Sequence, residues 1–233
     1  MWVVGADGCK AGWVYAARNV RSGDVELGVV SHARSLLELS WKPAIVCIDV
    51  PIGLPDAGGR ECDRLARAVL GWPRRNSVFP APVRTALWTS SREEASRITQ
   101  AVDGRRVSAQ SWALYPKIRE IDALLDASPS RERVHEVHPE VSFWAWKGER
   151  AVREGKKTAA GMAIRLCLAE SWLGPAVLAS ARSRRRKREV GDDDILDAIA
   201  ALWTATRVST REARTLPPCP PSDAHGLPMR IVY

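Results

Sequence analysis

Val3-Val4-Gly5-Ala6-Asp7 and Ala44-Ile45-Val46-Cys47-Ile48-Asp49 are two apolar runs, and each of them ends on an aspartate. Runs of this length and composition predict buried strands of an α/β sheet. If the two strands are neighbours, Asp7 and Asp49 emerge side by side at one edge of the sheet, where open α/β sheets bind their ligands. Aspartate also begins turns and caps helices, but the glycine- and proline-containing segments that follow both residues favour a site loop.

The rest of the pattern predicts one α/β domain over residues 1–233, of which 45% are apolar. The first three strands form a meander, and residues 60–130 form a mainly helical insertion that contains a proline-rich loop at 76–82. The predicted strands are 2–6, 12–18, 25–30, 44–49 and 133–138, and the predicted helices are 34–39, 60–71, 117–127, 159–172 and 193–208.

A third acidic group, Asp192-Asp193-Asp194 with Asp197, opens the predicted closing helix. Asp192 and Asp193 suit the helix cap and the helix dipole. Asp197 lies beyond the first turn beside the apolar stripe, where an ionised group is costly without a partner. We therefore predict that Asp194 and Asp197 join Asp7 and Asp49 as ligands of a divalent cation, and their hard oxygen atoms favour Mg²⁺ or Mn²⁺.

Three further polar residues are candidates for the same site. Glu136 lies in the predicted strand 133–138 and is predicted to be a ligand or the group that orients water; the alternative is a hydrogen-bonded carboxylate of an edge strand. His135 and His138 point to opposite faces of that strand, which excludes a zinc site of the H-E-x-x-H type. Lys156 and Lys157 precede a helix, where they either contact phosphates or are simply exposed.

Charge favours a polyanionic partner, because the formal net charge is +8 and six of the seven residues 182–188 are Arg or Lys. Such a run attracts a phosphate backbone without reading sequence, or else it is a solvated loop. The five cysteines are widely spaced without a C-x-x-C pair, so we expect reduced thiols. With no apolar stretch of about 18 residues and no signal-peptide pattern, we expect a soluble, cytoplasmic protein.

Seven motifs spread over nearly the whole chain resemble an uncharacterised domain family that is regarded as predicted nucleases with a ribonuclease H-like fold. These motifs, in chain order, are Gly5-Ala6-Asp7-Gly8-Cys9-Lys10-Ala11-Gly12-Trp13, Asp49-Val50-Pro51-Ile52-Gly53-Leu54, Arg60-Glu61-Cys62-Asp63, Ser77-Val78-Phe79-Pro80-Ala81-Pro82-Val83-Arg84, Glu136-Val137-His138-Pro139-Glu140-Val141-Ser142-Phe143, Lys156-Lys157-Thr158 and Asp193-Asp194-Ile195-Leu196-Asp197-Ala198.

The resemblance implies a mixed sheet of five main strands, with the second strand antiparallel and helices on either side. It matches Asp7 to the first-strand aspartate of ribonuclease H-like nucleases and Asp49 to the acidic residue that ends the fourth strand. The segment from Asp194 to Ala200 is similar to the closing-helix motif of Holliday-junction resolvases of that superfamily. The basic run at 182–188 has no counterpart in the family pattern.

The predicted function is hydrolysis of nucleic-acid phosphodiester bonds by a metal-dependent nuclease. Two metal ions about 4 Å apart would activate water and stabilise the leaving oxygen, with Asp7 bridging them and the other aspartates completing their shells. Glu136 would orient the nucleophile, and positively charged side chains would hold the nonbridging phosphate oxygens. The residues predicted for that second role are Arg84, Lys156 and Lys157.

Two other functions are compatible with the same sequence. A nucleic-acid-binding protein without turnover would keep the fold and the basic charge. A phosphotransferase of the sugar-kinase or actin-like class also places a first-strand aspartate before a glycine turn, as in Gly5-Ala6-Asp7-Gly8, but needs a second phosphate-binding domain for which this chain is short. DNA and RNA are equally compatible, and a junction-cutting role would favour a homodimer, although no interface signature such as a heptad run is present.

Overall fold

The computed structural model describes residues 1–126, 128–183 and 189–233. The side chains of the basic run at 182–188 lie outside the described residues, so its predicted role remains a prediction. Within the described part of the chain, no helix combines the length and the apolar character that crossing a membrane requires.

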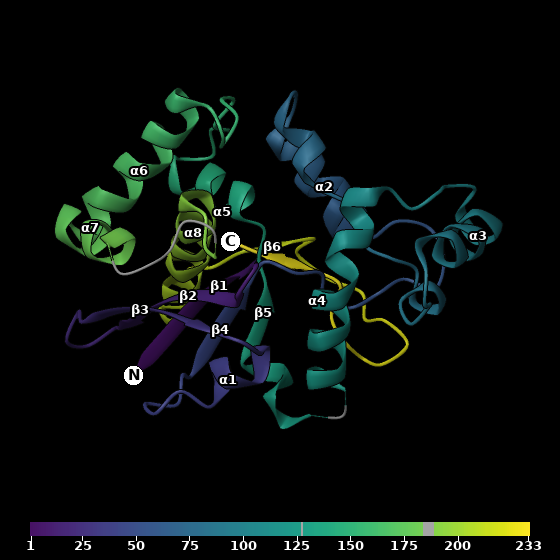
Figure 1. Cartoon of the computed structure of the whole chain (residues 1–233), viewed down its shortest axis with the longest axis horizontal. Helices are drawn as coiled ribbons and strands as arrows, with labels where there is room; N and C mark the ends of the chain where they lie inside the picture. The colour runs from purple at the N-terminus through teal and green to yellow at the C-terminus, as the bar shows by residue number, and fades with distance from the viewer. Residues whose placement is uncertain (127, 184–188) are drawn as a thin grey trace.

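A five-stranded mixed sheet forms the centre of the fold, with strand order β3-β2-β1-β4-β5 (Figure 1). Antiparallel pairing joins β1 to β2 and β2 to β3, whereas β1, β4 and β5 are parallel. The predicted mixed sheet with an antiparallel second strand is therefore confirmed. The strands are β1 (Trp2–Cys9), β2 (Gly12–Asn19), β3 (Val25–Val30), β4 (Ile45–Ile48) and β5 (Val134–Glu136).

The two aspartate-ending runs are neighbouring parallel strands, as predicted, and Ala6 pairs with Ile48. Asp49 directly follows β4, and its backbone N–H donates to the carbonyl oxygen of Ala6 at 3.0 Å. Asp7, by contrast, does not end its strand. The antiparallel pairing with β2 continues through Asp7, which lies opposite Val14, as far as Cys9. The tight turn to β2 begins only after Cys9, so the backbone pairing extends up to that residue.

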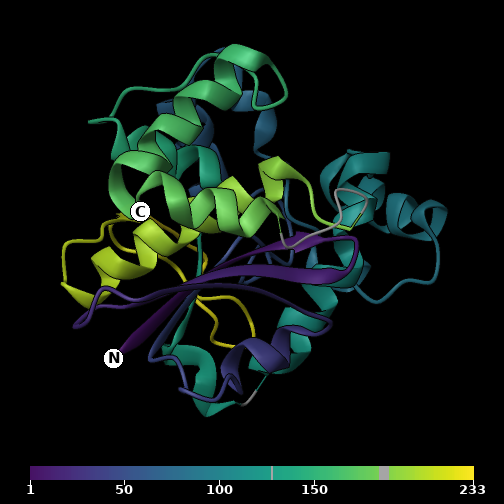
Figure 2. The same cartoon turned by 60° about the vertical axis from the view of Figure 1, so that its left-hand side comes forward.

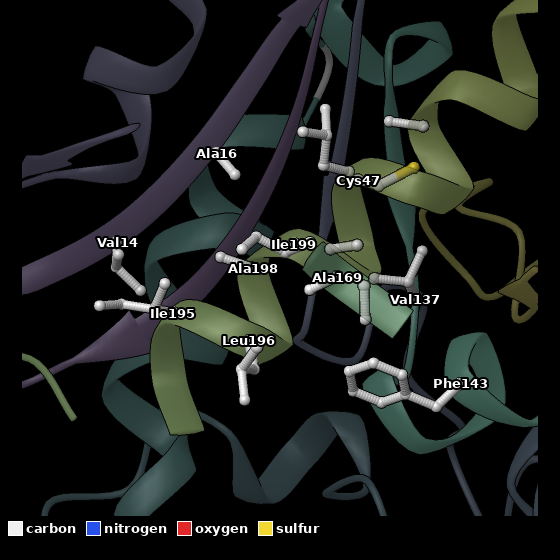
Figure 3. Close-up of a cluster of buried hydrophobic side chains, with 14 of the residues drawn as sticks. Val14, Ala16, Cys47, Val137, Phe143, Ala169, Ile195, Leu196, Ala198 and Ile199 are labelled. Atoms are coloured by element: carbon white, nitrogen blue, oxygen red, sulfur yellow. The ribbon is translucent and has the colours of Figure 1, made fainter. Parts of the chain in front are cut away.

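Helices α5 (Pro139–Trp146), α6 (Ala159–Leu173) and α8 (Asp192–Ser209) cover one face of the sheet (Figure 2). Their apolar side chains pack on Val14, Ala16 and Cys47 of the sheet, as Figure 3 shows. Gly5 lets α8 approach β1 closely: a Cβ at this position would lie 1.9 Å from the backbone nitrogen of Leu202. Because side chains alternate along a strand, Asp7 faces α8 as Gly5 does.

Helices α1 (Ala33–Leu37) and α4 (Ala109–Leu125) cover the opposite face, where Ile118 and Ile121 pack on Trp13. Residues 61–125 also hold α2 (Glu61–Leu70), α3 (Arg92–Asp103) and two 3₁₀ turns, η1 (Arg74–Ser77) and η2 (Arg84–Ala86). The middle section is thus mainly helical, as predicted. Its proline-containing loop begins at Val78 rather than at residue 76, because η1 extends to Ser77.

Three further parts of the prediction differ from the structure. Helix α4 begins at Ala109 instead of residue 117, capped by Ser108, whose Oγ accepts the N–H of Ser111 at 3.0 Å. Strand β5 ends at Glu136, because Pro139 starts α5 with His138 as its N-cap. Helix α7 (Pro175–Ser183) and the small antiparallel pair β6 (Thr215–Leu216) and β7 (Ile231–Val232) were not predicted.

Candidate functional site

A cavity of about 570 Å³ lies where the carboxyl ends of β1 and β4 meet the start of α8. Asp7 reaches it from β1, Asp49 from the residue after β4, and Asp194 and Asp197 from α8. The structure therefore brings together four acidic residues from three distant parts of the sequence. We call Asp7, Asp49, Asp194 and Asp197 the acidic cluster.

Burial makes the negative charge of the acidic cluster costly. Asp7 is 9% exposed and Asp197 is 3% exposed. Burial raises the pKa of Asp7 well above its usual value, and the negative charges of Asp49 and Asp197 raise it further. Burial also raises the pKa of Asp49 and Asp194, and it raises that of Asp197 to about 6 against the opposing effect of Lys156. Carboxylates in this state are stabilised by a proton or by a cation.

Lys156 is the ammonium group that contacts this cluster. Its Nζ donates to Asp197 Oδ2 at 2.6 Å and lies 3.5 Å from Asp193 Oδ2. Burial lowers the pKa of Lys156, but Asp197 outweighs that effect and the pKa is raised. Lys157, the other predicted lysine, is exposed and does not line the cavity.

The acidic cluster offers the donor atoms that Mg²⁺ or Mn²⁺ prefers, namely carboxylate oxygens. Among the described residues, no hydrogen bond reaches the carboxylate of Asp49, so its oxygens are available as ligands. In the described structure, however, no three residues of the acidic cluster have carboxylate oxygens that all lie within 4.8 Å of one another. A cation bound by three of these groups would have to draw them closer together.

A different acidic group meets the 4.8 Å spacing, namely Cys62, Asp63 and Glu136. Arg60 already neutralises this group, because its guanidinium donates to Asp63 Oδ1 at 2.6 Å and to both oxygens of Glu136 at 2.6 Å. All of these side chains are buried. We therefore interpret this group as a buried ion-pair network and not as a metal centre.

Glu136 lines the cavity, but its bonds point to a positioning role. Besides Arg60, it accepts the backbone N–H of Ile52 at 2.6 Å, and Arg60 donates to the carbonyl oxygen of Ile52 at 3.1 Å. The pair thus fixes the loop that follows Asp49. This geometry corresponds to the alternative given above, a hydrogen-bonded carboxylate on the edge strand β5.

Arg84, the predicted phosphate contact, lies away from the cavity lining. Its guanidinium donates to Asp122 Oδ1 at 3.1 Å and to Asp223, and its side chain is 11% exposed. Arg84 therefore joins α4 to the C-terminal segment. The local motif gave no sign of this, because both partners are distant in the sequence.

Five basic residues that the sequence analysis did not select as site residues line the cavity: Lys10, Arg60, Arg74, Lys117 and His138. Lys117 Nζ donates to the carbonyl oxygen of Gly12 at 2.6 Å and stands 4.3 Å from the ring centroid of Trp13. His138 Nε2 lies 3.3 Å from the carbonyl oxygen of Ser77, and its Nδ1 is buried without a partner among the described residues. The sequence held a signal for some of these residues, because Lys10, Arg60 and His138 stand in the motifs quoted above and Arg74 lies close to one of them.

The sequence matches one protein family over residues 5–222, and the family is described as "Protein of unknown function (DUF429)". The chain belongs to this family. The membership agrees with the predicted resemblance to an uncharacterised domain family, and the description of DUF429 names no activity. Neither the curated proteins nor the solved structures contain a match to the chain.

Proposed function

We propose that this DUF429 protein is a nuclease that depends on a divalent metal and hydrolyses phosphodiester bonds of nucleic acid. One observation carries the proposal: the acidic cluster gathers four carboxyl groups from β1, the β4 exit and α8 around one cavity. The mixed sheet with its antiparallel second strand is the arrangement expected of a ribonuclease H-like fold. The formal net charge of +8 supports a polyanionic substrate.

The residues of the acidic cluster would hold Mg²⁺ or Mn²⁺, which supplies activation of water and stabilisation of the leaving oxygen. Asp7 Oδ1 accepts the N–H of Gly8 at 2.7 Å, a bond that fixes the orientation of this carboxyl group. Arg60 and Glu136 fix the loop that carries Asp49. Lys156 lies against Asp197 at the cavity wall, where its ammonium group can also meet a phosphate oxygen. A cytoplasmic location and a homodimer belong to the same proposal.

Cleavage assays test this proposal directly. Purified protein is incubated with labelled single-stranded, duplex and branched DNA and RNA, with Mn²⁺, Mg²⁺ or EDTA. We expect cleavage that requires the metal and falls by at least about 100-fold in Asp7→Asn, since a metal site supplies several kcal/mol of stabilisation. Asp24→Asn, at an exposed position in the β2–β3 turn, is the matched control and keeps full activity.

The proposal is wrong if the folded protein cleaves none of these substrates, or if Asp7→Asn cleaves as fast as the unmodified protein. The first of these outcomes would favour a second candidate, a nucleic-acid-binding protein without turnover. One observation supports that candidate: Lys156, 2.6 Å from Asp197, already supplies a positive charge where a cation would bind. A calorimetric Mn²⁺ titration separates the two, because only the nuclease requires a metal site.

A further inference from the structure

Residues 72–79, which we call the rim segment, follow α2 in the chain (Figure 1). Arg74, Ser77 and Val78 of this segment line the cavity. The segment contains η1 and has two exposed aromatic side chains, Trp72 at 74% and Phe79 at 40% exposure. Phe79 lines the cavity. Single exposed aromatic side chains are common on protein surfaces, but these two belong to one short segment beside the cavity.

The rim segment is held firmly in place despite its exposed side chains. Val78 is buried in a cluster with Cys62, Ala66 and Leu70. The carbonyl oxygen of Val78 accepts two hydrogen bonds from the guanidinium of Arg67, at 2.7 and 3.1 Å. A fixed backbone presents aromatic rings at low entropic cost, which favours a binding surface.

Two arginines of the rim segment have a long ion pair or none within the described structure. The guanidinium of Arg74 makes no hydrogen bond to the described residues, although its side chain is only 17% exposed and lines the cavity. Its nearest carboxylate oxygen, on Glu140, is 3.9 Å away and is held by Arg165 at 2.7 Å. Arg75 is exposed and has no ion pair within the described structure.

Other arginines lie close to the segment. Burial lowers the pKa of Arg67, Asp63 opposes that effect, and the nearby charges of Arg105 and Arg75 lower it further. Arg105 has a carboxylate partner in Asp103 at 2.6 Å. The surface thus combines the weakly paired Arg74 and the exposed Arg75 with exposed rings, which matches the phosphates and bases of one chain of nucleotides.

We propose that the rim segment binds unpaired nucleotides of a single-stranded nucleic acid, with Trp72 and Phe79 stacking on bases and Arg74 and Arg75 contacting phosphates. The choice of nucleic acid rests on the proposed function. Stacking on aromatic side chains requires bases that are free of a duplex, and each stacked base contributes about 1–3 kcal/mol. The strand would then continue past Phe79 into the cavity that holds the acidic cluster.

Fluorescence anisotropy tests this proposal in EDTA, so that no cleavage interferes. The probes are labelled single strands of about 12 nucleotides, of DNA and of RNA, and duplexes of the same length. Phe79→Leu and Trp72→Leu remove the rings and keep apolar side chains. Trp88→Leu is the matched control, because Trp88 is 62% exposed and does not line the cavity.

We expect Phe79→Leu and Trp72→Leu each to weaken single-strand binding by at least about 5-fold and to leave duplex binding unchanged. Trp88→Leu leaves both unchanged. Arg74→Gln reduces the slope of log Kd against log salt for single strands by about 0.7, whereas Arg21→Gln, on the distant β2–β3 turn, does not change it. Comparing the DNA and RNA strands identifies which nucleic acid is bound.

Equal losses for Phe79→Leu and Trp88→Leu, or equal losses on single strands and duplexes, would overturn the proposal, with circular dichroism confirming that each variant is folded. Failure of the nuclease proposal has a different signature. Single-strand binding that depends on Phe79, combined with no cleavage in Mn²⁺ or Mg²⁺, keeps the rim segment and removes the activity. Cleavage by the unmodified protein with no effect of the rim variants on binding does the reverse.

Discussion

Gly5→Ala tests whether the close packing of α8 on β1 assembles the acidic cluster. The new Cβ would lie 1.9 Å from the backbone nitrogen of Leu202 and 2.4 Å from the carbonyl oxygen of Ala198. Neither atom belongs to a flexible side chain, so the helix backbone must withdraw by about 1.5 Å to reach the 3.4 Å of an ordinary contact. Asp197 precedes Ala198 on the same helix and would move away from Asp7.

Two measurable effects follow from this displacement. Overpacking of a core costs about 1–3 kcal/mol, and a clash with the helix backbone belongs at the upper end of that range. For a chain of this length we expect Tm to fall by about 6–12 °C. Metal ligands tolerate shifts of about 0.2 Å, so Mn²⁺ affinity should fall by at least about 10-fold in protein that is still folded.

The assays are thermal unfolding by circular dichroism and calorimetric Mn²⁺ titration well below Tm. Gly59→Ala is the matched control: no atom lies within 4 Å of its Cβ position and its φ is not in the left-handed region, so stability should stay within about 1 kcal/mol of the unmodified protein. If Gly5→Ala were as stable as Gly59→Ala and bound Mn²⁺ equally well, the role given to the α8–β1 contact would be refuted.

Three further predictions concern single side chains. Burial, and to a smaller extent the charge of Arg230, lowers the pKa of His135 to about 4, so the unfolded state binds the proton more readily than the folded state. The free energy of unfolding, measured in urea titrations, should therefore fall by up to about 3 kcal/mol between about pH 6.5 and pH 4. His135→Gln should reduce that fall. Lys156→Met removes the ammonium group that is paired with Asp197 and should tighten Mn²⁺ binding by about 10-fold in calorimetry. Equal tightening in the exposed control Lys157→Met would contradict the role given to this ion pair. Arg84→Gln should cost about 3 kcal/mol in urea unfolding, because it leaves Asp122 and Asp223 without their charged partner, and should not change single-strand binding.

The sheet was predictable from the sequence because its buried strands are nearly continuous apolar runs. The runs that contain Val3 and Val46 have little polar interruption, and the parallel pairing of β1 with β4 followed from them. The end of β1 was not predictable in the same way. Asp7 and Gly8 look like turn residues locally, yet the hairpin partner on β2 keeps them in the strand through non-local hydrogen bonds.

The start of α5 illustrates a second limit of local patterns. The strand predicted to run to residue 138 stops at Glu136, and Pro139 begins α5. A proline after an apolar run can follow a strand, but it is equally suited to the first turn of a helix. Choosing between the two requires the position of the chain that follows. In the structure, Val141 and Phe143 of α5 pack in the buried core, which provides the tertiary reason for helix at this point.

The arginines show why the acidic residues of the site were easier to predict than its basic residues. A buried carboxylate can be predicted from the sequence, because an aspartate beside an apolar stripe is costly without a partner, whichever residue that partner is. An arginine is tolerated in many surroundings, so its role depends on the carboxylates with which it forms ion pairs in the folded structure. Arg84 has two, one of them 139 residues away, whereas Arg74 reaches only an oxygen at 3.9 Å that another arginine holds. The two arginines therefore differ through partners that are remote in the sequence, and no local pattern reveals that difference.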